Sequence, residues 1–140
     1  MNKRFLLEQC KRARVVTEDE MRLYADTNNT WWINHQKGHL YLIEALDAYL
    51  NSKDCINKKQ LRQLLKKKIA VADNIINELD KKYDYFQNEL EIDPDDEYIY
   101  SLNDGISCEG YQFRKIINKQ KYYDKKSYEK TDWKKLGFIK

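Results

Sequence analysis

The chain has 140 residues, of which 35% are charged and 41% hydrophobic, with a formal net charge of +3. This length and composition fit one soluble domain with one hydrophobic core. No apolar run approaches the roughly 18 residues of a membrane span, and the basic start lacks the apolar stretch of a secretory signal. We therefore expect a cytoplasmic protein without membrane contact. Its three widely spaced cysteines fit free thiols better than a disulfide framework.

Charge alternates along the chain in blocks. Residues 1–56 are neutral overall, whereas residues 57–82 carry eight Lys/Arg and three Asp/Glu. Residues 83–110 carry nine acidic residues and no basic one, and residues 111–140 carry ten basic and three acidic residues. A functional interpretation must therefore explain a basic, an acidic and a second basic block.

Helical patterns dominate the first 82 residues. Thr17–Glu20 (TEDE) has the spacing of a capping box, which predicts a helix start. Apolar residues at helical spacing follow from Leu40 to Leu50. Gly38 and the β-favouring Asn28–Ile33 (NNTWWI) leave the start of that helix open.

The middle of the chain predicts a loop and two further helices. Asn51–Asp54 (NSKD) has the composition of a loop. Apolar residues at helical spacing then predict short helices over about 57–66 and 70–82, separated by a short turn.

After Tyr83 the pattern changes to alternation. Residues 83–92 and 97–102 predict two strands joined by the turn Asp93–Asp96 (DPDD), which together form a β-hairpin. Asn103–Gly105 (NDG) is expected to close the second strand, and Glu109–Lys121 to form a short helix. Residues 1–120 would then be one domain. Residues 121–140 would be a basic, aromatic C-terminal segment, either docked or partly disordered.

Residues 56–86 resemble the MarR-like winged helix-turn-helix regulators, aligned without gaps. The apolar positions of the second helix are occupied by Leu61 and Leu65, and those of the third by Ala72, Ile75, Ile76 and Leu79. Lys66 stands where the family's turn usually has Gly, and Arg62 where a small residue is usual. The resemblance implies a mainly α fold with a small β-hairpin, a winged helix-turn-helix with an N-terminal helical extension.

The same resemblance implies that the ligand is double-stranded DNA and that residues 66–81 contact it. We expect phosphate contacts from the lysines and base contacts from the others, namely Lys66, Lys67, Lys68, Ala70, Val71, Asn74, Asn77 and Lys81. The protein would be a small regulator of transcription or replication, encoded by a phage or another mobile element. Whether it acts as a monomer or a homodimer stays open.

The acidic residues of the expected hairpin favour an alternative function. Like charges repel, so a wing of this composition cannot lie against phosphates. In the alternative, the protein is a binding module or inhibitor that docks a basic protein partner through Glu91, Asp93, Asp95, Asp96 and Glu97.

Catalytic and metal-binding patterns are weak. His35 and His39 are four residues apart, which places both imidazoles on one helix face and is compatible with zinc. However, no HExxH or CxxC pattern accompanies them, so ordinary histidines are the preferred interpretation. No cofactor, metal ion or enzymatic activity is expected.

Overall fold

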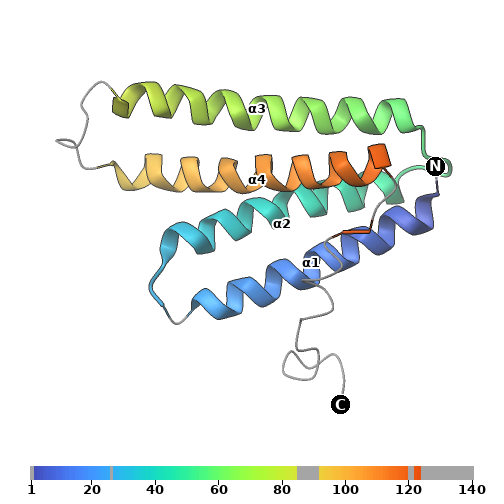
Figure 1. Ribbon diagram of the computed structural model, residues 1–140, viewed down its shortest axis with the longest axis horizontal. Helices are drawn as coiled ribbons and strands as arrows, with labels where there is room; N and C mark the ends of the chain where they lie inside the picture. Colours follow the sequence, from blue (N-terminus) through green and yellow to red (C-terminus); the bar gives the residue numbers. More distant parts are fainter. Residues whose placement is uncertain (1, 26, 85–91, 120–121, 124–140) are drawn as a thin grey trace, which may run out of the picture.

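The computed structural model describes residues 2–25, 27–84, 92–119 and 122–123 (Figure 1). Within these ranges the chain forms four helices and no strand: α1 (Lys3–Ala25), α2 (Thr30–Asn51), α3 (Lys58–Asp84) and α4 (Pro94–Lys119). Helix α4 packs on both α2 and α3, and α1 packs on α2. The winged helix-turn-helix fold expected from the sequence is therefore wrong.

The expected second strand is part of a helix. Residues 97–102 lie in α4, which begins at Pro94. Asp93 caps this helix, because its side chain accepts a hydrogen bond from the backbone N–H of Asp95 at 2.8 Å. Pro at the first helical position and acidic residues in the first turn both stabilise a helix start. The sequence DPDD is thus a helix start rather than a hairpin turn. The expected first strand falls largely on residues 85–91, which lie outside the described residues.

The two helices expected in the middle of the chain are one. Helix α3 continues through residues 67–69, where the turn was expected, and it contains neither Gly nor Pro. Leu61, Leu65, Ile69 and Ala72 are buried. These positions follow one unbroken helical period across the expected turn. Lys66 avoids the left-handed backbone that would be strained for it, because the chain stays helical.

The first two helices also differ from expectation at their ends. Helix α1 runs through the predicted capping box, and the buried Thr17 hydroxyl donates to the carbonyl of Ala13 at 2.8 Å. Helix α2 starts after Asn29, whose side chain accepts a hydrogen bond from the backbone N–H of Trp32. Asn51 still belongs to α2, and the expected loop follows from Ser52.

One hydrophobic core joins the four helices. Its largest fully buried side chains come from every helix: Leu6, Leu42, Ile43, Leu50, Leu61, Leu65, Phe113 and Ile117. Tyr123, beyond α4, is also buried against this core, and its ring centroid lies 5.8 Å from that of Phe113. Residues 122–123 are thus docked onto the helices.

Helices α2 and α4 approach closely at two glycines. A Cβ atom on Gly38 would lie 2.0 Å from the carbonyl oxygen of Leu102, and one on Gly105 would lie 1.9 Å from that of His35. Only a residue without a side chain permits this contact between backbones. The predicted turn at Asn103–Gly105 is therefore a helix-packing site inside α4.

Among the described residues, none of the helices has the length and apolar character needed to cross a membrane.

Candidate nucleic-acid interface

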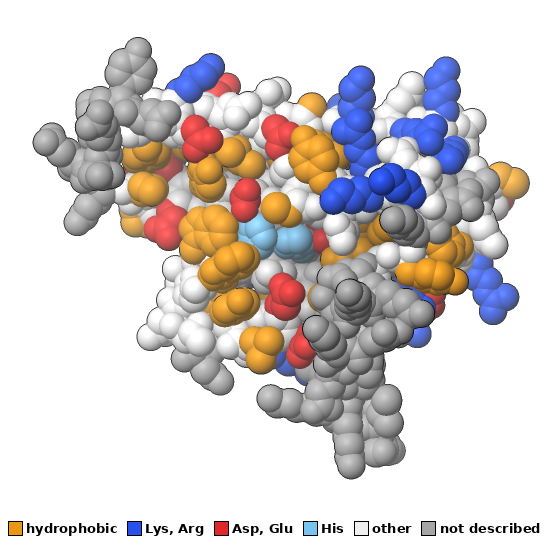
Figure 2. All heavy atoms as spheres, viewed as in Figure 1, with side chains coloured by type: hydrophobic (Ala, Val, Ile, Leu, Met, Phe, Trp, Pro, Cys, Tyr) orange, Lys and Arg blue, Asp and Glu red, His pale blue; other side chains and the backbone are white. Residues whose placement is uncertain are grey.

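The first half of α3 carries a dense positive charge. Residues 58–68 contain six Lys/Arg and no Asp/Glu. Because Leu61 and Leu65 face the core, the basic side chains lie on the remaining faces of the helix. Figure 2 shows basic side chains gathered over this end of the molecule.

The last turns of α4 extend this charge. Helices α3 and α4 run antiparallel, so the end of α4 lies beside the start of α3 (Figure 1). The Arg62 guanidinium donates to the Asn118 side-chain oxygen at 2.9 Å, which ties the two helices together. We call the basic residues in the first half of α3 and the last turns of α4 the basic face: Lys58, Lys59, Arg62, Lys66, Lys67, Lys68, Arg114, Lys115 and Lys119.

Two hollows flank α3 within the basic face. One, of about 210 Å³, is lined by Arg62, Lys66 and Arg114 with Leu65 and Asn118. Three cationic side chains around a small hollow suit a phosphate group.

The second hollow is a groove of about 500 Å³ on another side of α3. It includes Lys67, Lys68, Val71 and Tyr41, and the ammonium of Lys68 lies 5.5 Å from the centre of the Tyr41 ring. Tyr41 is 52% exposed and Val71 is 54% exposed. The groove therefore combines lysines with exposed apolar surface.

The residues predicted to contact DNA share one helix and an outward orientation. Lys66, Lys67, Ala70, Val71, Asn74, Asn77 and Lys81 are exposed, and Lys68 is half-buried. Seven of these eight residues are thus exposed, but the turn that would isolate a recognition helix is not present in α3. Lys66, Lys67 and Lys68 belong to the basic face, whereas Asn74, Asn77 and Lys81 lie farther along α3.

Sequence reasoning missed the contribution of α4. Arg114, Lys115 and Lys119 lie in the basic block of residues 111–140, and none of them was among the residues predicted to contact DNA. Their position beside Arg62 depends on the antiparallel pairing of α3 with α4. The spacing of Phe113, Ile116 and Ile117 was the available signal, since it orients the basic positions outward.

The acidic residues gather at the opposite end of the α3–α4 pair. Asp96 accepts hydrogen bonds from the Lys82 ammonium at 2.7 Å and from the Tyr83 hydroxyl at 2.5 Å. These two donors hold the pKa of the Asp96 carboxyl below its ordinary value. Asp95 is exposed and Glu97 is half-buried, while Glu91 lies outside the described residues.

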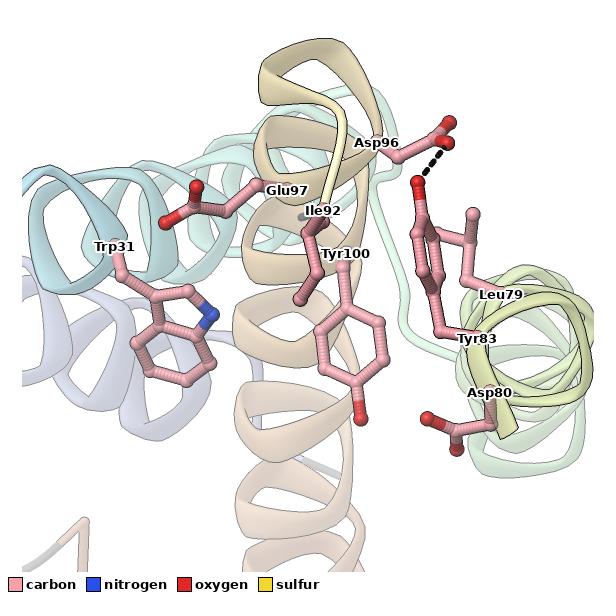
Figure 3. A pocket seen from close by; sticks show the side chains of 8 residues that line it. All are labelled: Trp31, Leu79, Asp80, Tyr83, Ile92, Asp96, Glu97 and Tyr100. Atoms are coloured by element: carbon pink, nitrogen blue, oxygen red, sulfur yellow. Dashed lines mark hydrogen bonds between the residues drawn. The ribbon is translucent and has the colours of Figure 1, made fainter. Parts of the chain in front are cut away.

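An aromatic pocket of about 270 Å³ lies at this acidic end (Figure 3). Trp31, Tyr83 and Tyr100 line it together with the carboxylates of Asp80, Asp96 and Glu97. Burial, and then a hydrogen bond with Asp80, raise the pKa of Tyr100. The pocket thus pairs aromatic faces with negative charge.

Comparison with models of known protein families, with curated protein sequences and with solved structures gave no match to this chain.

Proposed function

We propose that the protein binds double-stranded DNA by contacting the phosphate backbone with its basic face. The observation that carries this proposal is the segregation of charge. The basic face joins nine Lys/Arg from two helices, and residues 58–68 and 110–119 contain no acidic residue. A concentrated positive surface is the electrostatic footprint of nucleic-acid binding.

The dimensions of the basic face suit a duplex. Lys58 and Lys68 are ten residues apart on α3, which corresponds to roughly 15 Å at 1.5 Å per residue. Duplex DNA carries one charge per about 1.7 Å, so about nine phosphate charges fall within this length. Side chains on several faces of α3 and on α4 then engage phosphates, which positions the protein without reading base sequence.

Salt dependence gives the proposal a quantitative test. If about five basic side chains neutralise phosphates, the logarithm of the affinity falls with a slope of roughly −4.5 against the logarithm of salt concentration. Raising salt from about 50 to 200 mM would then weaken binding by roughly 500-fold. Fluorescence anisotropy with a labelled AT-rich duplex of about 30 base pairs measures both affinities.

Matched double variants distinguish DNA binding by the basic face from a general effect of net charge. Arg62→Ala combined with Lys66→Ala removes two cations from the small hollow and is expected to reduce both the affinity and the salt slope. Lys81→Ala combined with Lys82→Ala removes two cations from the far end of α3 and is expected to change both much less. Absence of binding at low salt, or equal losses in the two double variants, would refute the proposal.

The aromatic pocket favours a second candidate function, docking of a basic protein segment at the acidic end. A Lys or Arg side chain is attracted by aromatic faces and by carboxylates, and Trp31 and Tyr100 lie around the pocket with Asp80 and Glu97 (Figure 3). This function is tested with a fluorescent lysine- and arginine-rich peptide. Binding that is lost in Trp31→Ala and kept in Arg62→Ala would support it, and equal binding by both variants would exclude this pocket.

A further inference from the structure

A cluster of polar side chains lies between α2 and α4, and none of its members belongs to the basic face. The candidate ligand atoms of His35, Asp104 and Cys108 all lie within 4.8 Å of one another. His35 comes from α2, while Asp104 and Cys108 are four residues apart on α4 and share one face of it. The close backbone contact at Gly105, beside the carbonyl of His35, brings the two helices near enough for this cluster to form.

Aromatic and polar neighbours hold the His35 ring in place. Its side chain is 7% exposed. The Trp31 ring stacks on it with a centroid distance of 5.2 Å and an interplanar angle of 14°. Its Nε2 lies 3.0 Å from Nε2 of His39, whose Nδ1 is hydrogen-bonded to the buried carboxylate of Glu109. The remaining nitrogen, Nδ1, lies 3.0 Å from Oδ2 of Asp104.

The Nδ1 atom of His35 is the polar atom that faces Asp104. It is buried and makes no aligned hydrogen bond in the structure, although Oδ2 of Asp104 lies 3.0 Å away. When His35 donates from Nε2 to His39, its Nδ1 carries a lone pair, and this nitrogen and the Asp104 carboxylate can bind one cation together.

We propose that His35, Asp104 and Cys108 form a binding site for a divalent transition-metal ion of the zinc type. Imidazole, carboxylate and thiolate are the ligands that zinc accepts, at bond lengths of about 2.0–2.3 Å. Tetrahedral coordination at these lengths separates ligand atoms by roughly 3.3–3.8 Å. The cluster needs adjustments of only about an ångström to reach this geometry, and three protein ligands leave a fourth position open.

The surroundings of Cys108 favour a cation and allow it to enter. The carboxylates of Asp104, Glu109 and Asp73 make the electrostatic potential around the Cys108 thiol negative. The same negative potential attracts a divalent cation, which in turn stabilises the thiolate. Cys108 is exposed and the Asp104 side chain is 32% exposed, so the ion reaches the site from solvent. The bound ion would link α2 to α4. The proposed metal site does not depend on DNA binding at the basic face.

The experiment uses the full chain without an affinity tag, reduced and stripped of metal. In the first measurement Co²⁺ is added alone, and the near-ultraviolet absorption of the thiolate-to-cobalt transition is recorded. In the second, the Zn²⁺ affinity is measured by competition with a chromogenic chelator. One equivalent of either ion is expected to bind. Cys108→Ser should abolish the thiolate band and weaken Zn²⁺ by at least about tenfold, and Asp104→Asn should weaken it similarly.

Cys55 provides the matched control. It is exposed and lies in the loop after α2, so Cys55→Ser should retain both the band and the affinity. In the wild-type chain, Zn²⁺ should slow alkylation of Cys108 by iodoacetamide and leave alkylation of Cys55 unchanged, as followed by mass spectrometry. Circular dichroism of each variant confirms that it is folded. Absence of stoichiometric binding by the wild-type chain, or a cobalt band that persists in folded Cys108→Ser, would overturn the proposal.

Discussion

The contact between α2 and α4 predicts a large effect for one added methyl group. Gly105→Ala places a Cβ atom 1.9 Å from the carbonyl oxygen and 2.9 Å from the carbonyl carbon of His35, and 3.1 Å from Cα of Gly38. All three are backbone atoms. A change of side-chain rotamer therefore cannot relieve the overlap, and the helices themselves must separate.

The size of the effect follows from that separation. Ordinary van der Waals contact begins at about 3.4 Å, so α2 must move from α4 by roughly 1.5 Å near Gly105. A gap of about 0.5–1 Å already loses a quarter to a half of the dispersion energy of a contact. Overpacking costs about 1–3 kcal/mol and occasionally more, and we place this substitution at about 3–4 kcal/mol. The better helix propensity of Ala returns about 1 kcal/mol. The net loss in the free energy of unfolding is therefore about 2–3 kcal/mol.

Urea unfolding followed by circular dichroism measures this loss, and Gly110→Ala is the matched control. A Cβ atom on Gly110 would lie 2.5 Å from Cγ1 of Ile69, which is a side-chain atom rather than a backbone atom. Since helix propensity changes equally in both variants, Gly110→Ala should cost less stability than Gly105→Ala, because a side chain rather than the partner helix backbone must shift. If Gly105→Ala were as stable as Gly110→Ala, the close contact between backbones would not exist as described.

Two further substitutions and the reactivity of one cysteine test other parts of the fold. Hydrogen bonds from Lys82 and Tyr83 lower the pKa of Asp96 in the folded state, so the stabilisation they give is present above the unfolded pKa and is lost as pH falls through the folded pKa. Asp96→Asn should therefore reduce the loss of stability on acidification. Urea titrations from neutral pH to below the ordinary carboxyl pKa of 3.8 measure this loss. Tyr123→Phe removes the hydroxyl that donates at 3.1 Å to the buried carboxylate of Glu109 in α4. This substitution should lower the free energy of unfolding by about 1–3 kcal/mol in the same assay. An unchanged stability would show that residue 123 is not docked. Burial raises the pKa of Cys10 to about 12, so this thiol should react with a thiol reagent only after unfolding, and fast reaction in the folded protein would contradict its place in the core.

In α3, apolar spacing predicts helix on both sides of residues 67–69, but the turn predicted there is wrong. These residues include neither Gly nor Pro, and the burial of Leu65, Ile69 and Ala72 continues one helical period through them. The hairpin was wrong for a related reason. A stretch of six residues such as 97–102 fits both alternation and helical spacing, and its helical continuation is set by the cap at Asp93 and by the core contacts of Ile106 and Phe113.

The sequence by itself determined the helical character of most of the described residues, the separation of basic from acidic blocks and the outward face of α3. Each of these depends on neighbours within a few turns of one helix. Only the tertiary structure placed Arg114 beside Arg62 and brought His35 next to Asp104 and Cys108. Those residues are more than 50 positions apart in the chain, and the antiparallel packing of α4 on α3 and the glycine contact between α2 and α4 bring them together. Helical periodicity orients a side chain relative to its own axis, but which helix it faces depends on how the whole core packs.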